Sequence, residues 1–128
     1  MIDLVWVYLY IVLVHWISDF ILQSNEMAQN KSTSNVWLTK HVIVYTMVTN
    51  VLWIPIIFVL NLKLLTFEYF LAMSLIFVTH WITDYITSKL NSKYWRLKDT
   101  HSFFVSIGFD QLLHYTQLFL IFRFLLFK

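Results

Sequence analysis

Four long apolar runs alternate with polar stretches along the chain. The runs cover residues 4–22, 41–60, 64–89 and 102–127. A helix rises about 1.5 Å per residue, so about 20 apolar residues cross the roughly 30 Å hydrocarbon core of a bilayer. Because a segment in lipid must satisfy its own backbone hydrogen bonds, a spanning segment of this kind forms a helix. The pattern therefore predicts four transmembrane helices in a single domain, residues 1–128.

The stretches between the runs predict how these helices are joined. Residues 23–40 are polar and are expected to form a loop with room for a short interfacial helix. The turn around 61–66 is short, so the helices on either side of it should be antiparallel neighbours. Pro55 lies inside the second run and is expected to kink it. The third run exceeds a minimal span and is expected to tilt or to project beyond the bilayer.

The composition also favours a helical membrane protein. Hydrophobic residues make up 59% of the chain and charged residues only 12%, whereas a soluble domain carries about 25% charged residues. One glycine and one proline provide little turn chemistry for an all-β fold, and the short alternating segments of a membrane β-barrel are missing from the sequence. We therefore predict an all-α, integral membrane four-helix bundle. The absence of cysteine excludes a thiol nucleophile and a cysteine-based zinc site.

The distribution of basic residues predicts the orientation. The loops after the first and third helices carry Lys31, Lys40, Lys89, Lys93, Arg96 and Lys98, and the opposite side carries Lys63, Arg123 and Lys128. Because cytoplasmic loops are enriched in Lys and Arg, both long loops should be cytoplasmic and both termini outside. We expect a multi-pass protein of the bacterial inner (cytoplasmic) membrane. The net charge of +2 gives no reason to expect a nucleic-acid partner.

A short sequence occurs twice. Residues 15–21 read His-Trp-Ile-Ser-Asp-Phe-Ile, and residues 80–86 read His-Trp-Ile-Thr-Asp-Tyr-Ile. The two copies fall toward the ends of the first and third predicted helices, which run in the same direction. This match predicts that the bundle is built from two parallel-related two-helix repeats, an arrangement that some transporters show.

Histidine and aspartate recur four residues apart inside the apolar runs. The pairs are His15/Asp19, His80/Asp84 and, in reversed order, Asp110/His114. Residues four apart lie on the same face of a helix. The reversed pair lies on an antiparallel helix, so in all three pairs the aspartate is nearer the cytoplasm and the histidine deeper. His41 begins the second helix on the same side, and we expect all seven side chains to share one layer near the cytoplasmic leaflet.

A divalent metal would explain these groups. Ionisable residues in hydrocarbon cost several kcal/mol unless they are paired or hydrated, and a metal keeps carboxylates ionised and imidazoles neutral. Histidine and aspartate without cysteine suit zinc, manganese or iron. The predicted ligands are His15, Asp19, His80, Asp84, Asp110 and His114, with Asp110, His114 and His41 as candidate acid/base groups. A two-metal site remains open.

Each residue by itself has an ordinary structural explanation. An aspartate near a helix end can meet water and headgroups, and a lone histidine can hydrogen-bond a neighbouring helix. The loop lysines are typical of a solvated cytoplasmic face, and they can also attract anionic headgroups or phosphates. The joint pattern of three pairs at matched depth is what favours a functional polar centre.

The motifs resemble a known family. They are His15-x-x-x-Asp19-Phe20-x-x-Gln23, then Met27-Ala28, Lys31 and His41, and later His80-x-x-x-Asp84 and Asp110-Gln111-x-x-His114. Together they resemble a small bacterial and phage membrane-protein family catalogued only as a domain of unknown function. The resemblance implies no activity, but it groups Gln23, Lys31 and Gln111 with the His/Asp set as substrate contacts. The chain is also distantly similar to membrane-bound metal-dependent hydrolases, through histidine and aspartate in apolar helices alone.

Three functions remain open from the sequence. The first is a metal-dependent hydrolase that acts on a phosphoester or lipid-linked substrate at the cytoplasmic leaflet. The second is a proton or metal-ion transporter, since intramembrane Asp and His chains are typical of proton relays. The third is a non-catalytic, holin-like or membrane-perturbing protein, which needs no defined polar centre. A homo-oligomer is compatible with all three, because four short helices enclose little space.

Overall fold

The computed structural model describes residues 4–126. Its elements in chain order are α1 (Leu4–Trp16), the π-helical segment η1 (Ile17–Ile21), α2 (Asn25–Asn30), α3 (Asn35–Val59), α4 (Phe67–Arg96), α5 (Thr100–Ile121) and the π-helical segment η2 (Phe122–Leu126). The described residues contain no β-strand, which confirms the prediction of an all-α protein. Residue 127 of the fourth predicted helix, and the ends of the predicted domain, lie outside the described part.

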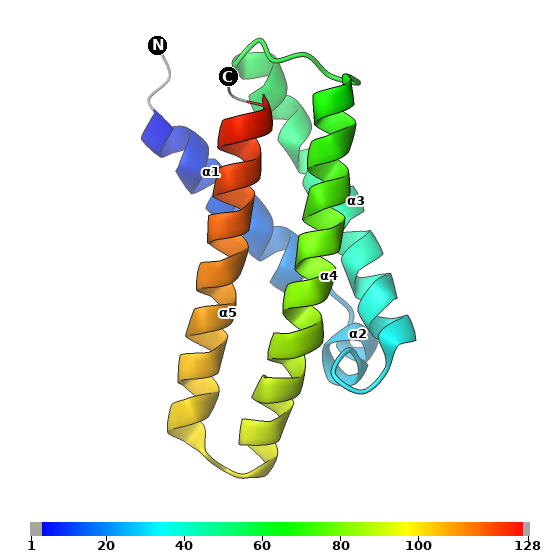
Figure 1. The fold of residues 1–128 in the computed structure, drawn as a ribbon, viewed down its shortest axis with the longest axis vertical. Helices are drawn as coiled ribbons and strands as arrows, with labels where there is room; N and C mark the ends of the chain where they lie inside the picture. Colours follow the sequence, from blue (N-terminus) through cyan, green and yellow to red (C-terminus); the bar gives the residue numbers. More distant parts are fainter. Residues whose placement is uncertain (1–3, 127–128) are drawn as a thin grey trace.

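Four long helices lie side by side in an elongated molecule (Figure 1). α4 packs against α3 and α5, while α1 crosses obliquely and packs against α3 and α5. The chain enters and leaves at one end, and α2 and the α4–α5 connection lie at the other end. α1 and α4 run in the same direction, and α3 and α5 run in the opposite direction, so the loops on each side fall together as the sequence predicted.

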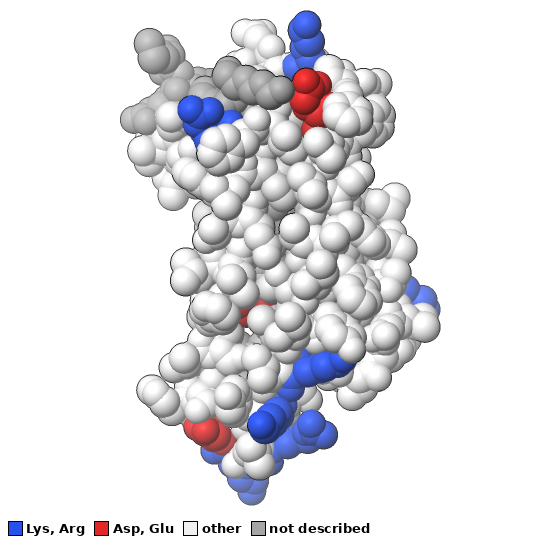
Figure 2. Space-filling model, viewed as in Figure 1, with Lys and Arg blue, Asp and Glu red and all other residues white. Residues whose placement is uncertain are grey.

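The outer surface is that of a membrane protein. Three helical segments, Leu4–Ile21, Asn35–Val59 and Phe67–Arg96, are long and apolar enough to cross a bilayer. α5 is not among the segments that are apolar enough to cross a bilayer, because Asp110, Gln111 and His114 lower its hydropathy. Large apolar side chains are exposed along the whole molecule, and Figure 2 shows charged side chains mostly at its two ends. Such an apolar belt is far larger than the exposed patches of soluble monomers.

Two helices extend beyond the runs from which they were predicted. α3 begins at Asn35 rather than 41, and α4 ends at Arg96 rather than 89. Both extensions lie at the end of the molecule that carries α2 and mix polar with apolar residues. The apolar run marks the part of a helix that lipid can cover, whereas backbone hydrogen bonds continue past it. The predicted short helix in the polar loop is present as α2, where the Ser24 hydroxyl accepts a hydrogen bond from the Met27 amide at 3.3 Å.

α1 widens into a π-turn where it reaches the buried polar side chains. The Leu22 amide donates to the Ile17 carbonyl at 3.0 Å, five residues back, and Ser18 and Asp19 are buried within this segment. The second copy of the repeated heptapeptide, residues 80–86, stays in regular α-helix within α4. π-Turns inside α-helices occur frequently at functional sites. The two copies of the heptapeptide therefore have similar side chains, but one is partly π-helical and the other is α-helical.

The half of the molecule near the termini is packed mainly with apolar side chains. Val7, Trp53, Ile57 and Phe122 are essentially fully buried there. Polar contacts also join helices within this half: the Tyr10 hydroxyl donates to the Leu52 carbonyl at 2.5 Å, and the Tyr69 hydroxyl donates to the Asn50 side-chain oxygen. The buried ionisable groups gather in the other half.

α4 ends in a turn that places a lysine in the left-handed region. Lys98 has a φ of 56°. Around it the Asp99 amide donates to the Tyr94 carbonyl and the Lys98 amide donates to the Trp95 carbonyl, each at 3.1 Å. This is the Schellman arrangement, in which glycine is favoured at the position of Lys98 because it has no Cβ.

We predict that Lys98→Gly stabilises the protein. Relief of the left-handed strain should exceed the extra entropy of glycine in the unfolded chain, for a net gain of about 0.5–1 kcal/mol. Denaturant unfolding in detergent measures the change. Lys93→Gly, inside α4, is the matched control and should lose about 1 kcal/mol. Equal losses for both variants would contradict the prediction.

Candidate metal centre

Seven ionisable side chains meet at one level of the bundle. They are His15, Asp19, His41, His80, Asp84, Asp110 and His114, and each is at most 8% exposed. They come from α1, η1, α3, α4 and α5, so residues far apart in the sequence converge. The structure thus brings together the whole set that helical spacing grouped. What their atoms contact decides which of them can act as metal ligands.

Four of these side chains form one compact set, here called the four-ligand group: Asp19, His41, His80 and Asp84. Their ligand atoms all lie within 4.8 Å of one another and could hold a metal ion. The His41 Nε2 lies 3.0 Å from Asp19 Oδ1, 3.2 Å from His80 Nε2 and 3.3 Å from Asp84 Oδ2. The His80 Nε2 lies 3.5 Å from Asp19 Oδ1 and 3.6 Å from Asp84 Oδ2.

These spacings match a tetrahedral ion. Bonds of about 2.0–2.1 Å to nitrogen and oxygen separate neighbouring ligand atoms by about 3.3–3.4 Å in a tetrahedron. The five measured edges run from 3.0 to 3.6 Å. Asp19 Oδ1 is buried and makes no hydrogen bond with the described residues, although two imidazole nitrogens lie close to it. A buried carboxylate oxygen without a hydrogen bond is rare in proteins, and a cation at the centre of the group would satisfy it.

A second set, here called the three-ligand group, consists of Asp84, Asp110 and His114. Its ligand atoms also lie within 4.8 Å of one another. The His114 Nε2 lies 3.1 Å from Asp84 Oδ1 and 3.3 Å from Asp110 Oδ1. Asp84 belongs to both groups: its Oδ2 faces His41 and His80, and its Oδ1 faces His114. One carboxylate on α4 therefore joins the two groups.

Lys31 adds a positive charge to this arrangement. It caps the C-terminal end of α2, and its Nζ donates to Asp84 Oδ2 at 2.8 Å. The same Nζ lies 3.4 Å from His41 Nε2. Burial acts to lower the pKa of the Lys31 amine, but the carboxylates of Asp84 and Asp19 outweigh it and raise that pKa above its ordinary value. Lys31 is thus an ammonium ion at neutral pH, held against the shared carboxylate.

His15 lies beside the two groups but has other partners. Its Nε2 contacts the Gln111 Oε1 at 3.1 Å, and the Gln111 Nε2 donates to Asp110 Oδ2 at 3.1 Å. A carboxylate only accepts, so the glutamine must turn its NH₂ toward Asp110 and its oxygen toward His15. His15 then donates from Nε2, and its Nδ1 accepts from the Tyr45 hydroxyl at 2.9 Å. The sequence predicted His15 as a ligand; its Nε2 also lies 3.5 Å from Asp19 Oδ2, while both ring nitrogens have hydrogen-bond partners in Gln111 and Tyr45.

Two further residues that contact the cluster were not predicted from the sequence. Tyr45 stacks on the His80 ring, with centroids 3.8 Å apart and planes at 20°, besides its bond to His15. The Thr87 hydroxyl donates to Asp110 Oδ1 at 2.5 Å. Both lie one helical turn beyond a residue that was singled out, Tyr45 after His41 and Thr87 after Asp84. That spacing was the available signal.

The three residues that were predicted as substrate contacts, Gln23, Lys31 and Gln111, differ in where they lie relative to the cluster. Lys31 and Gln111 contact members of the cluster directly. Gln23 makes no described hydrogen bond to the cluster, and its Oε1 is buried without a hydrogen-bond partner among the described residues. The Nδ1 of His80 is also buried without such a partner, so its ring is positioned by stacking on Tyr45.

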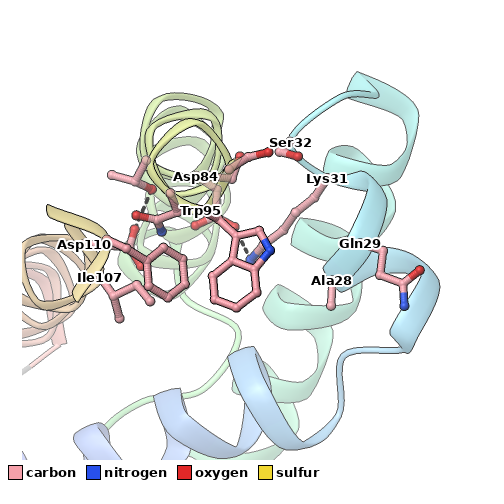
Figure 3. A pocket seen from close by; sticks show the side chains of 13 residues that line it. Ala28, Gln29, Lys31, Ser32, Asp84, Trp95, Ile107 and Asp110 are labelled. Carbon is pink, nitrogen blue, oxygen red and sulfur yellow. Dashed lines mark hydrogen bonds and ion pairs between the residues drawn. The ribbon is translucent and has the colours of Figure 1, made fainter. Parts of the chain in front are cut away.

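A cavity of about 530 Å³ opens beside the cluster, between α2, α4 and α5. Figure 3 shows Lys31 reaching toward Asp84 on one side of the cavity, with Asp110 and Ile107 on the other. Its polar lining also includes Ser32, Thr87, Ser88, Asn91 and Ser92, and its apolar lining includes Trp95, Phe103 and Ile107. In Figure 2 acidic atoms are visible in a hollow midway along the apolar surface. The cavity has the size of a small-molecule site.

We predict that Tyr45→Phe destabilises the protein by about 1–3 kcal/mol, because the buried His15 Nδ1 loses its donor. Unfolding in detergent measures the loss. Tyr85→Phe, which removes an exposed hydroxyl on α4, is the control and should change stability by no more than about 0.5 kcal/mol. A loss no larger than that of the control would show that the hydroxyl does not hold the His15 ring.

Comparison with known proteins adds a family but no activity. No curated protein matches the chain, and no solved structure matches it. One family model matches residues 7–128, a range that includes every member of both ligand groups. The chain belongs to the family described as "Protein of unknown function (DUF3307)".

Proposed function

We propose that this protein is a membrane-embedded, metal-dependent hydrolase that acts on a phosphoester or lipid-linked substrate. The observation that carries the proposal is the four-ligand group, in which five of the six distances between ligand atoms run from 3.0 to 3.6 Å and suit a tetrahedral ion. The group adjoins a cavity through Asp84, with the Lys31 ammonium on its wall. A divalent ion beside an anion-binding lysine is a common arrangement for phosphoryl chemistry.

In this proposal α5 is the fourth membrane span of a four-helix bundle built from two parallel-related repeats. Its polar residues face the bundle interior, where Asp110 and His114 are buried, while Phe104, Val105 and Phe109 are exposed to lipid. Lys89, Lys93, Arg96 and Lys98 lie at the α2 end, so the positive-inside rule places that end in the cytoplasm and both termini outside. The site then opens at the cytoplasmic leaflet of a bacterial inner membrane.

Nitrogen and oxygen ligands without sulfur suit zinc, manganese or iron. The ion would balance the charges of Asp19 and Asp84, which the bilayer interior would otherwise disfavour. With all four protein ligands in place, an ion of this kind would act on substrate by opening a fifth position, where it would polarise a phosphoryl oxygen and lower the pKa of a bound water. His41 lies inside the four-ligand group, so its role here is that of a ligand rather than an acid/base group.

The residues of this chain would then perform the hydrolysis. Lys31 has three donor hydrogens, of which one contacts Asp84, and another can bind an anionic phosphoryl oxygen in the cavity. Asp110 and His114 activate the attacking water. Its oxygen forms a new bond to phosphorus, its proton passes to the Asp110 carboxylate, the bond to the leaving oxygen breaks, and that oxygen takes up the proton from Asp110. Gln111 and Thr87 hold Asp110 in place.

Metal content tests the proposal first. Elemental mass spectrometry of detergent-purified protein should find at least about one equivalent of a transition metal, lost in His80→Ala/Asp84→Ala because two of the four ligands are gone. His101→Ala, which removes an exposed histidine, is the control and should keep the metal. If the wild type holds no metal even after incubation with zinc and manganese, the proposal fails, and proton flux in liposomes becomes the next assay.

Lys31 provides a test of the substrate side. Lys31→Met should raise the KM for a hydrolysed phosphoester about 10- to 100-fold, because a hydrogen bond to a charged group contributes about 1.5–3 kcal/mol. Steady-state kinetics on a panel of lipid and water-soluble phosphoesters provides the measurement. Lys93→Met, on the exposed end of α4, should leave KM unchanged. An unchanged KM in Lys31→Met would remove the lysine from substrate binding.

A further inference from the structure

The two ligand groups meet the cavity differently. Asp84 and Asp110, both in the three-ligand group, line it, whereas Asp19, His41 and His80 do not. Four protein ligands complete a tetrahedron, as in closed structural metal sites, whereas catalytic sites keep three protein ligands and an open position. An ion in the four-ligand group would therefore be closed off. An ion in the three-ligand group would have an open position beside the cavity.

The shared carboxylate links the two positions. Asp84 directs Oδ2 toward His41 and His80, at 3.3 and 3.6 Å, and directs Oδ1 toward His114 at 3.1 Å. A carboxylate that offers its two oxygens to different ligand sets is suited to bridge two ions. In two-metal hydrolytic sites the ions lie about 3.5–4 Å apart and clamp the attacking and leaving oxygens.

Asp110 is held as a metal-ligating carboxylate usually is. The Thr87 hydroxyl donates to its Oδ1 at 2.5 Å, and the Gln111 amide donates to its Oδ2 at 3.1 Å. Such outer hydrogen bonds orient ligands, and their removal typically costs 10- to 100-fold in metal affinity. Gln111 is itself fixed by His15, so the contacts around Asp110 extend back to Tyr45.

The charges suggest unequal affinities. Asp19, Asp84 and Asp110 carry three negative charges, and one divalent ion together with Lys31 already balances them. A second divalent ion leaves the cavity positive, which suits an anionic phosphoester but weakens the binding of that ion in the absence of substrate. The closed position offers four protein ligands and the open position three, so the closed position should fill first.

We propose that Asp84, Asp110 and His114 form a second, open divalent-cation site, bridged by Asp84 to a closed site at Asp19, His41 and His80. Its part in hydrolysis rests on the function proposed above: Asp110 and His114 would then hold the ion, and the ion would take over from them the activation of the attacking water. Cation binding at the site is independent of that function and can be measured by itself.

The experiment is a titration of metal-free, full-length protein in detergent with Mn²⁺. Calorimetry should show two equivalents, the second weaker, and electron paramagnetic resonance should show coupling between the two ions. Asp110→Asn and His114→Gln should each lose the weaker equivalent and keep the tighter one. Thr87→Val, a milder change, should weaken only the second ion, by about 10-fold. His101 is exposed and lies on α5, the helix of Asp110 and His114, so His101→Gln should bind both ions like the wild type.

A single equivalent in the wild type, or two equivalents retained in Asp110→Asn and His114→Gln, would overturn the second site. Phosphoester hydrolysis would then still support a one-metal enzyme. Two coupled ions without hydrolysis of any phosphoester would support the second site and contradict the proposed function. Circular dichroism and unfolding of each variant show whether it is folded, and Thr87→Val keeps every ligand in place.

Discussion

Burial of three carboxylates inside an apolar bundle is the constraint on which the rest of this structure depends. Asp19, Asp84 and Asp110 are at most 8% exposed, and an unpaired buried charge costs several kcal/mol. Every helix in the described chain except the short η2 supplies a residue to this region, including Lys31 from the end of α2. The same charges therefore bring residues from all of these helices to one place.

The two halves of the molecule differ in how their side chains are packed. Near the termini, Val7, Trp53 and Phe122 belong to a buried apolar core. Near α2, polar contacts replace apolar packing, and a cavity reaches Asp84 and Asp110. The apolar half fixes the helix positions that an array of ligand atoms needs, because ligands must be held to within about 0.5 Å of a productive geometry. In the polar half, apolar packing gives way to polar contacts and a cavity.

Hydropathy predicted the apolar parts of the helices well, because lipid contact requires apolar side chains there. It predicted the polar ends of the helices less well. It missed the start of α3 at Asn35 and the end of α4 at Arg96, since hydrogen-bonded backbone continues into polar surroundings. It could not show the π-turn at Asp19, because a widened turn depends on what packs against it. Helical spacing did identify the His/Asp pairs, since residues four apart share a face in any regular helix.

The sequence by itself determined which groups would be buried and on which helix faces, because apolar runs and a period of 3.6 residues are local properties. Only the tertiary structure decided which atoms meet. In the folded protein Lys31 contacts Asp84, and the two ring nitrogens of His15 contact Tyr45 and Gln111. Asp84 belongs to both the four-ligand group and the three-ligand group. The physical reason is that separations of about 3 Å between helices follow from packing and crossing geometry, which spacing along a single helix does not encode.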